Sequence, residues 1–300
     1  MGDALQQLRD LPVRHDFFVG VDSDGSVFDT MELKQKECFC PCFIQHFGLQ
    51  AASRFARQVW EFVNLYSDTR GCNRYVGVQG SHRLMREWDV FRQRGLSIPE
   101  LPSLKAWIAE SSALGLPSLR SAVEATGDTE LRRCLAWSED VDARIEEMVH
   151  GVGPFPGARE SLEKLRQQAD VIVVSGTPIQ ALRREWQEHG LEPYVDFIAG
   201  QEAGRKRDHL ICATDGKYAE GNVLLVGDAP KDRDAAHRAG ALFYPIVPGK
   251  EEASWQRFRA EALERFYAGE YAGAYERKRL AEFDRALPEC PPWRRSDQNS

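Results

Sequence analysis

Two aspartates that lie one residue apart offer the most distinctive chemistry in the sequence. Asp22 and Asp24 follow an apolar run at residues 17–21, and Gly25 comes next. A short apolar run bounded by turn residues predicts a buried strand, and buried parallel strands place functional groups just past their carboxyl ends. We therefore expect the two carboxylates side by side at the rim of a sheet, with Gly25 turning the chain away. Carboxylates held this close repel each other, which raises the pKa of one or requires a cation.

Polar groups at two further strand ends distinguish this pattern from a simple turn, in which Asp and Gly are also common. The apolar run within residues 170–178 ends at Ser175 and Gly176, where a helix should begin. The run within residues 222–240 ends at Asp228. Because parallel strands end at one edge of their sheet, these groups should converge with the aspartate pair.

Groups of these types would suit a phosphate ester as substrate. A helix N-terminus with the Ser175 hydroxyl can cradle phosphate oxygens, and Lys206 would hold a positive charge against them. Several carboxylates around one point call for a divalent cation, and oxygen ligands favour Mg²⁺. With that cation present, Asp22 can attack phosphorus as a nucleophile. Asp24 can protonate the leaving oxygen and later take the proton of the attacking water.

The elements that would position these groups alternate between strands and helices. Apolar runs at 170–178, 195–200, 222–227 and 241–249 are separated by amphipathic stretches. This alternation predicts an α/β fold with a Rossmann-like parallel sheet and helices on both faces. Residues 30–152 instead carry apolar residues at helical spacing and predict an inserted all-helical cap domain.

The domain organisation that we expect is discontinuous. Residues 1–29 and 153–250 should form the α/β catalytic core, with residues 1–16 as a loose lead-in, and residues 30–152 should form the cap. Residues 251–300 should be helices and a frayed tail that pack on the core.

The composition is that of a globular protein, 42% hydrophobic and 28% charged, with a formal net charge of −7. The negative balance argues against nucleic-acid binding, which needs a basic face. We expect no membrane span and no secretory signal, because apolar stretches of the necessary kind are missing. The seven cysteines, an odd number in a chain of this length, predict reduced thiols and a cytoplasmic protein. A monomer and a homodimer are equally compatible with the sequence.

A polar stretch of the expected cap domain, residues 66–75, holds Arg70, Asn73 and Arg74. The stretch is compatible with an ordinary surface loop and with a loop that faces the substrate. In the second case these three side chains would contribute to substrate specificity.

The chain resembles the haloacid dehalogenase superfamily of aspartate-nucleophile phosphotransferases in four motifs that occur in the family's order. The first motif stands as VDSDGS at residues 21–26, and the second as VIVVSGT at residues 171–177. Lys206 is the best match to the third-motif lysine, because Lys217 leaves little room for a helix before the fourth motif, GDAPKDRDAAHRAG at 227–240. The place of the helical insertion is similar to that of the C1-type cap in members like phosphoglycolate phosphatase and beta-phosphoglucomutase.

The resemblance implies a role for each of these residues. Asp22 would be the nucleophile and Asp24 the general acid/base. Mg²⁺ would be held by Asp22, the backbone carbonyl of Asp24, and Asp228, while Asp232 would bind a metal-bound water or steady Lys206. The phosphate-binding residues would be Ser175, Gly176 and Lys206.

These patterns lead to one main hypothesis and three alternatives. The main hypothesis is a Mg²⁺-dependent phosphatase that hydrolyses a small phosphorylated metabolite through an aspartyl-phosphate on Asp22. A phosphomutase that resembles beta-phosphoglucomutase would instead return the phosphoryl group to its bound intermediate. A phosphonate-cleaving enzyme would need a cap lysine, for which Lys34 and Lys36 are available, but Asp24 favours ester chemistry. A non-catalytic binding module on the same fold is disfavoured by the intact set of polar groups.

Overall fold

The computed structural model describes residues 2–296, and the chain divides into two compact units. Unit 1 comprises the described residues up to Met31 together with Gly151–Leu287. Unit 2 comprises Glu32–His150 together with the described residues from Pro288 onward. The short helix α2 (Thr30–Leu33) contains the first passage of the chain from unit 1 to unit 2.

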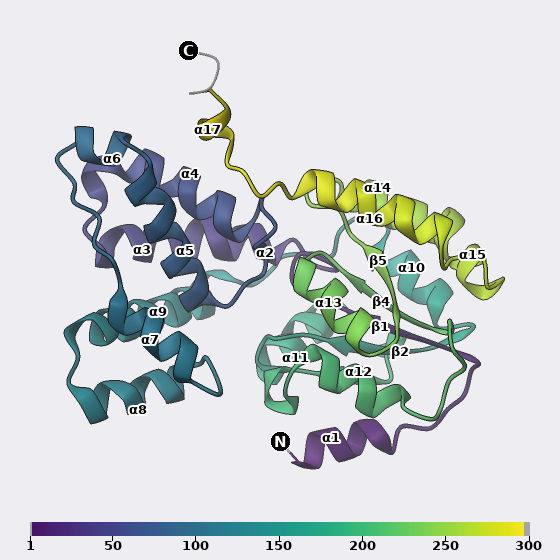
Figure 1. Cartoon of the computed structure of the whole chain (residues 1–300). Coiled ribbons are helices and arrows are strands. Elements are labelled where there is room, and N and C mark those ends of the chain that lie inside the picture. Colours follow the sequence, from purple (N-terminus) through teal and green to yellow (C-terminus); the bar gives the residue numbers. More distant parts are fainter. Residues whose placement is uncertain (1, 297–300) are drawn as a thin grey trace. The chain divides into compact units, whose positions relative to one another are not determined.

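Unit 1 is built on one parallel sheet of five strands (Figure 1), so the predicted α/β architecture is confirmed. The strands are β1 (Phe17–Val21), β2 (Ala169–Val174), β3 (Phe197–Ala199), β4 (Val223–Gly227) and β5 (Leu242–Pro245). Their order is β3-β2-β1-β4-β5, which makes β1 the central strand. β1 pairs in parallel with β2 on one side and with β4 on the other. The ends of these three strands are therefore neighbours.

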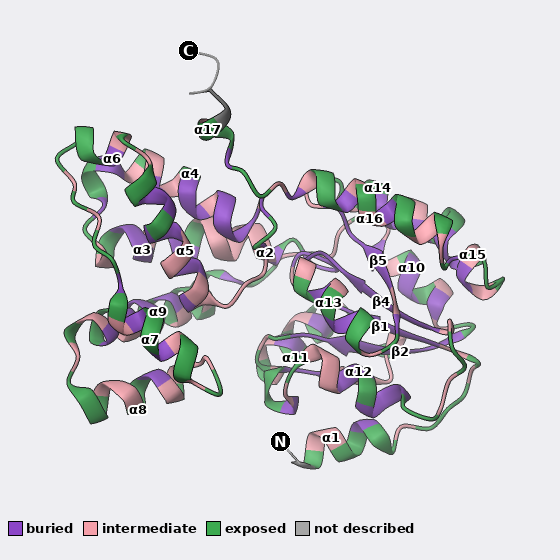
Figure 2. Cartoon of the chain, viewed as in Figure 1, coloured by how far each residue is buried: buried purple, intermediate pink, exposed green. Residues whose placement is uncertain are grey.

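Helices cover both faces of this sheet, and the strands between them are buried (Figure 2). Side chains along each strand alternate between the faces, so Phe18 and Val19 belong to different buried clusters. Helices that contribute to the cluster of Phe18 are α1 (Gly2–Arg9), α12 (Lys206–Thr214), α13 (Pro230–Arg238) and α16 (Ala274–Ala286). Helices that contribute to the cluster of Val19 are α10 (Ala158–Leu165), α11 (Ile179–Glu188), α14 (Glu251–Arg257) and α15 (Leu263–Tyr267).

The N-terminal residues correct one prediction. A loose lead-in over residues 1–16 is wrong for its first half, because residues 2–9 form α1. Leu8 is fully buried in the same cluster as Leu210 of α12, and Leu5 packs against that cluster. Leucines three residues apart share one face of a helix, which here covers α12.

The regular secondary structure in the described residues of unit 2 is helical. After a π-helical segment at Lys34–Phe39 its helices are α3 (Cys40–His46), α4 (Ser53–Asn64), α5 (Arg74–Glu87), α6 (Val90–Gln93), α7 (Pro102–Glu110), α8 (Leu116–Thr126), α9 (Thr129–Met148) and α17 (Pro292–Ser296). Trp60 and Trp137 are fully buried at its centre, with ring centroids 5.9 Å apart. Within the described part of the chain, none of the helices is both long enough and apolar enough to cross a bilayer.

The C-terminal residues divide between the two units, whereas the sequence predicted that all of residues 251–300 pack on the core. Helices α14, α15 and α16 do lie in unit 1. Residues from Pro288 to Ser296 belong to unit 2, because Trp293 stacks on Trp88 with centroids 4.6 Å apart and planes at 7°. The predicted frayed tail includes residues 297–300, which lie outside the described residues.

Candidate active site

The candidate site begins where the three central strands of unit 1 end. Asp22 is the first residue past β1, and its backbone N–H donates to the carbonyl of Val226 in β4 at 2.9 Å. Val21 pairs with Val173 of β2 and with Val226 of β4. Ser175 and Asp228 each come two residues after those partners, so both lie at the same edge of the sheet as Asp22.

Three aspartates come together at this edge. Asp22, Asp228 and Asp232 are all buried, and each offers a carboxylate oxygen within 4.8 Å of the others. Lys206, the first residue of α12, joins them with its ammonium group. Its Nζ lies 2.7 Å from Oδ1 of Asp22 and 2.6 Å from Oδ1 of Asp232. We call these four residues the acidic cluster.

The backbone and the motif glycine hold the cluster in place. The Ala229 backbone N–H donates to Oδ2 of Asp232 at 3.2 Å, at the start of α13. Gly227 lets the backbone approach Asp232 closely, because a Cβ added to the glycine would lie 2.7 Å from Cβ of Asp232. The Ser26 hydroxyl donates to Oδ1 of Asp228 at 3.0 Å and so fixes that carboxylate from the turn after β1.

The charges of the acidic cluster do not balance. Burial, followed by the carboxylates of Asp232 and Asp228, raises the pKa of Asp22 well above its ordinary value, although the Lys206 ammonium opposes this rise. Burial alone would lower the pKa of Lys206, but the carboxylates of Asp22 and Asp232 outweigh it and raise that pKa. Three buried carboxylates thus share one ammonium.

A divalent cation fits this donor set. The groups that converge are all carboxylate oxygens, the hard ligands that Mg²⁺ accepts, and they carry more negative charge than Lys206 neutralises. The raised pKa of Asp22 also favours a cation at this position, because added positive charge would keep that carboxylate ionised. Asp22, Asp228 and Asp232 are therefore the side chains that could hold the ion.

Asp24 has different surroundings from Asp22. The Thr30 hydroxyl donates to its Oδ1 at 2.5 Å, and the Thr177 hydroxyl donates to its Oδ2 at 2.6 Å. Thr177 belongs to the loop after β2, so this bond ties the ends of β1 and β2 together. Each carboxylate oxygen of Asp24 thus accepts a hydrogen bond from a threonine hydroxyl.

The loop between β2 and α11 exposes its backbone at the mouth of a helix. Ser175 is buried and Gly176 is exposed, and the Thr177 N–H donates to the Ser175 hydroxyl at 3.2 Å. Helix α11 begins at Ile179, whose N–H donates to the Glu202 carboxylate at 3.0 Å. The loop therefore presents a hydroxyl and the start of a helix at the same sheet edge as the acidic cluster.

Part of the chain is similar to a known protein family. Residues 110–245 match the family model of the haloacid dehalogenase-like hydrolases. This stretch includes Ser175, Lys206, Asp228 and Asp232. Over this stretch, a little under half of its length, the chain is similar to the haloacid dehalogenase-like hydrolases. The first aspartate motif, with Asp22 and Asp24, precedes the matched residues.

Several solved structures are also similar to the chain. A candidate phosphoglycolate phosphatase from Lactobacillus delbrueckii subsp. bulgaricus ATCC BAA-365 has 20% identity and a TM-score of 0.48, over 76% of this chain and 85% of that chain. A candidate phosphoglycolate phosphatase from Haemophilus somnus 129pt has 15% identity and a TM-score of 0.45, over 78% and 86%. A candidate beta-phosphoglucomutase from Bacteroides vulgatus has 13% identity and a TM-score of 0.43, over 90% and 99%. A search of the curated proteins finds no match.

The residues predicted to contribute to substrate specificity form contacts within unit 2. Arg70 is buried and donates to the Leu65 carbonyl at 2.9 Å. Asn73 caps the N-terminus of α5 by accepting from the Tyr75 N–H at 3.0 Å. Arg74 donates to the Asp142 carboxylate at 2.7 Å. All three have local structural partners, and their role in specificity stays a prediction.

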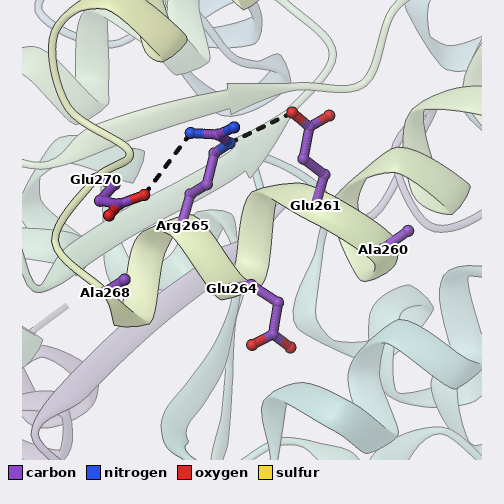
Figure 3. Close-up of a pocket in the computed structure, with 6 residues that line it drawn as sticks. All are labelled: Ala260, Glu261, Glu264, Arg265, Ala268 and Glu270. Carbon is purple, nitrogen blue, oxygen red and sulfur yellow. Dashed lines mark hydrogen bonds and ion pairs between the residues drawn. The ribbon is translucent and has the colours of Figure 1, made fainter.

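A surface pocket elsewhere in unit 1 has no part in this site. It lies against α15 and the π-helical turn before it, and Arg265 there forms ion pairs with Glu261 and Glu270 (Figure 3). None of the residues of the acidic cluster lines it. Its charged groups already neutralise one another in part, so we assign it no ligand.

Two contributors to the site went unrecognised in the sequence. Thr30 gave no signal, because it follows the turn in what looked like an ordinary helix start. Thr177 stood in the second motif, but only the structure pairs it with Asp24. Polar contacts between strand ends depend on how neighbouring strands align, which the spacing of residues along the chain does not give.

Proposed function

We propose that the protein is a Mg²⁺-dependent phosphatase that hydrolyses a small phosphorylated metabolite through an aspartyl-phosphate on Asp22. The observation that carries this proposal is the acidic cluster with Lys206 at the end of the central strand. The match of residues 110–245 to the family model of the haloacid dehalogenase-like hydrolases supports it. When bound, Mg²⁺ would neutralise the carboxylates and the charge that develops on the phosphoryl oxygens.

In the first step of this proposal, Asp22 attacks phosphorus. Lys206 holds Oδ1 of Asp22 at 2.7 Å, which leaves Oδ2 as the attacking oxygen. The bond from Oδ2 to phosphorus forms while the bond from phosphorus to the ester oxygen breaks. Asp24 in its protonated form gives its proton to the departing oxygen, so the product leaves as a neutral alcohol.

In the second step, water hydrolyses the aspartyl-phosphate. Asp24, now ionised, takes a proton from the water as its oxygen attacks phosphorus. Inorganic phosphate leaves, Asp22 is regenerated, and Asp24 is again protonated. Ser175 and the backbone at Gly176 would bind the phosphoryl oxygens during both steps, as a loop before a helix can do.

Turnover of a generic aryl phosphate tests the proposal. We expect the wild-type protein to release phosphate from 4-nitrophenyl phosphate with Mg²⁺ and not with EDTA. Asp22→Asn should abolish this turnover and keep the wild-type circular dichroism spectrum. The matched control is Asp234→Asn, which changes an exposed aspartate on the same helix as Asp232 and should retain activity.

The outcomes separate the alternatives. A wild-type protein without Mg²⁺-dependent turnover on a broad panel of phosphate esters would contradict a phosphatase and favour a binding module. Isomerisation of a sugar phosphate without net phosphate release would favour a mutase. A panel of phosphorylated metabolites, assayed with and without Mg²⁺, would then identify the substrate.

A further inference from the structure

Ser23, the residue between the two proposed catalytic aspartates, is fully buried and makes an unusual number of hydrogen bonds. Its carbonyl accepts from three backbone N–H groups of the following turn, at residues 26, 27 and 28, over 3.3, 2.9 and 3.1 Å. The turn that carries Asp24 and Gly25 is therefore closed on the backbone of Ser23.

The side chain of Ser23 is bound just as closely, by helix α11. The Trp186 indole N–H donates to Oγ of Ser23 at 3.0 Å, and the Ser23 hydroxyl donates to Oε2 of Glu185 at 3.2 Å. An indole can only donate and a carboxylate can only accept, so the two partners fix the direction of the hydroxyl. Trp186 is itself fully buried.

Trp186 also braces the far side of the same turn. Its ring meets Phe28 edge-to-face, with centroids 5.8 Å apart and planes at 80°. Phe28 in turn forms a backbone bridge with Asp24, and its carbonyl accepts from the Gly25 N–H at 2.9 Å. One tryptophan thus contacts the turn before and after Asp24.

Helix α11 links these contacts to the loop proposed to bind phosphate, because the helix begins two residues after Thr177, with Pro178 as its N-cap. Thr177 makes a second tie between the same two segments through its bond to Asp24. The aspartate turn is therefore held by the loop after β2 through Thr177 and by the second half of α11 through Glu185 and Trp186.

We propose that Ser23, held by Trp186 and Glu185, is a positioning residue that keeps Asp24 aligned with the ester oxygen relative to Asp22. This inference rests on the proposed phosphatase function and adds a residue to it. Ser23 touches no reacting atom, and its effect reaches the chemistry through the orientation of Asp24.

The inference predicts a loss that depends on the leaving group. Phenol, whose pKa is about 10 like that of tyrosine, needs a proton from Asp24 as it leaves, whereas the more acidic 4-nitrophenol can leave as an anion. We expect Ser23→Ala to lower kcat/KM for phenyl phosphate about tenfold and that for 4-nitrophenyl phosphate less than threefold, with similar KM values. Trp186→Phe, which replaces the indole with a smaller aromatic ring that has no N–H, should show the same pattern more weakly.

Ser161→Ala is the matched control. Ser161 is also fully buried in unit 1, and its hydroxyl donates to the Gly157 carbonyl at 2.6 Å. Ser161→Ala also removes a buried hydroxyl, so a general loss of stability would appear in this variant too. The ratio of its kcat/KM values for the two aryl phosphates should nevertheless equal that of the wild type. An equal loss on the two substrates in Ser23→Ala, or no loss on either, would overturn the inference.

Hydrogen exchange keeps the test independent of activity. If the wild-type protein hydrolysed no phosphate ester, the proposed function would fail, but the contacts of Ser23 could still be tested. Amides of residues 24–28 should exchange at least tenfold faster in Ser23→Ala than in the wild type, and at the wild-type rate in Ser161→Ala. Unchanged exchange in Ser23→Ala would show that its side chain does not hold the turn.

Discussion

Replacing Lys206 with methionine would remove the ammonium group from the acidic cluster while keeping a side chain of similar length. Lys206 lies 2.7 Å from Asp22 and 2.6 Å from Asp232, and both carboxylates are buried. Each pair is worth about 6 kcal/mol of attraction at an effective dielectric constant of about 20, and the cost of burying the charges offsets much of it. We therefore expect Lys206→Met to lower the free energy of unfolding by about 3–5 kcal/mol in EDTA, the range for a buried pair that loses one partner.

Added Mg²⁺ should change this difference in a defined direction. Without Lys206 the three carboxylates attract a cation more strongly, so Mg²⁺ should stabilise Lys206→Met more than the wild type. An ion present at about 100 times its dissociation constant adds about 2.7 kcal/mol. Asp228→Asn should behave in the opposite way, with no large loss in EDTA and little stabilisation by Mg²⁺, because it removes a ligand and relieves repulsion.

Urea unfolding followed by circular dichroism, in EDTA and in Mg²⁺, measures both effects. The control is Lys217→Met, because the Lys217 ammonium donates to the backbone carbonyls of Leu8 and Leu11 and lies outside the acidic cluster. It should cost less than Lys206→Met and leave the Mg²⁺ response unchanged. A Lys206→Met protein as stable as the wild type in EDTA, or an Asp228→Asn protein with the full Mg²⁺ response, would refute the electrostatic reasoning.

Three further predictions concern other parts of the chain. Gly227→Ala should lower the free energy of unfolding by about 1–3 kcal/mol and weaken the Mg²⁺ response in the same urea titration, because its methyl group would lie 2.7 Å from Cβ of Asp232. Burial lowers the pKa of His82 to about 4. The neutral imidazole therefore costs no stability above about pH 6.5, and the free energy of unfolding falls by up to about 3 kcal/mol as the pH drops towards 4. His82→Gln should make the urea midpoint less sensitive to pH over that range, and an unchanged sensitivity would contradict this. Trp293→Ala should destabilise unit 2 by about 1 kcal/mol or more through loss of its stacking on Trp88, measured as faster amide exchange in α5, with unchanged rates as the contrary result.

Much of the fold of unit 1 follows from simple patterns in the sequence. The apolar run at residues 17–21 matches β1 to the residue, because a strand buried on both faces needs an unbroken apolar sequence. The run at residues 195–200 is longer than β3, which has only three residues, since flanking apolar side chains also pack against the sheet. Turn residues past each run mark the edge at which the site should form.

Elements that depend on one or two contacts were harder to predict. α1 has few apolar residues, and its helical structure is stabilised by packing against α12, far along the chain. The residues after Pro288 looked like an unstructured tail because they are rich in proline and polar residues. Their place in unit 2 depends on the stack of Trp293 on Trp88, a partner that no local pattern identifies.

In the candidate site, too, some residues could be predicted from the sequence and others could not. The strand-end pattern placed Asp22 and Asp228 at one edge, and the structure brings them together with Lys206. Ser23 looked like a mere spacer, because its hydrogen-bond partner Trp186 is 163 residues away. Charged site residues can be recognised in the sequence from their type and position. The residues that orient them are of ordinary types, and their contacts exist only in the folded chain.

The two aspartates of the first motif show why the surroundings, and not the residue type, separate the proposed roles. Asp22 lies among two carboxylates and an ammonium, and burial together with those carboxylates raises its pKa, so added positive charge would favour the ionised form that a nucleophile needs. Asp24 accepts hydrogen bonds from the hydroxyls of Thr30 and Thr177, one on each carboxylate oxygen. A group that must gain and lose a proton in each turnover needs that second kind of environment. Exchanging the environments, by placing a cation beside Asp24 or removing the one beside Asp22, should therefore disable the proposed chemistry even with both aspartates intact.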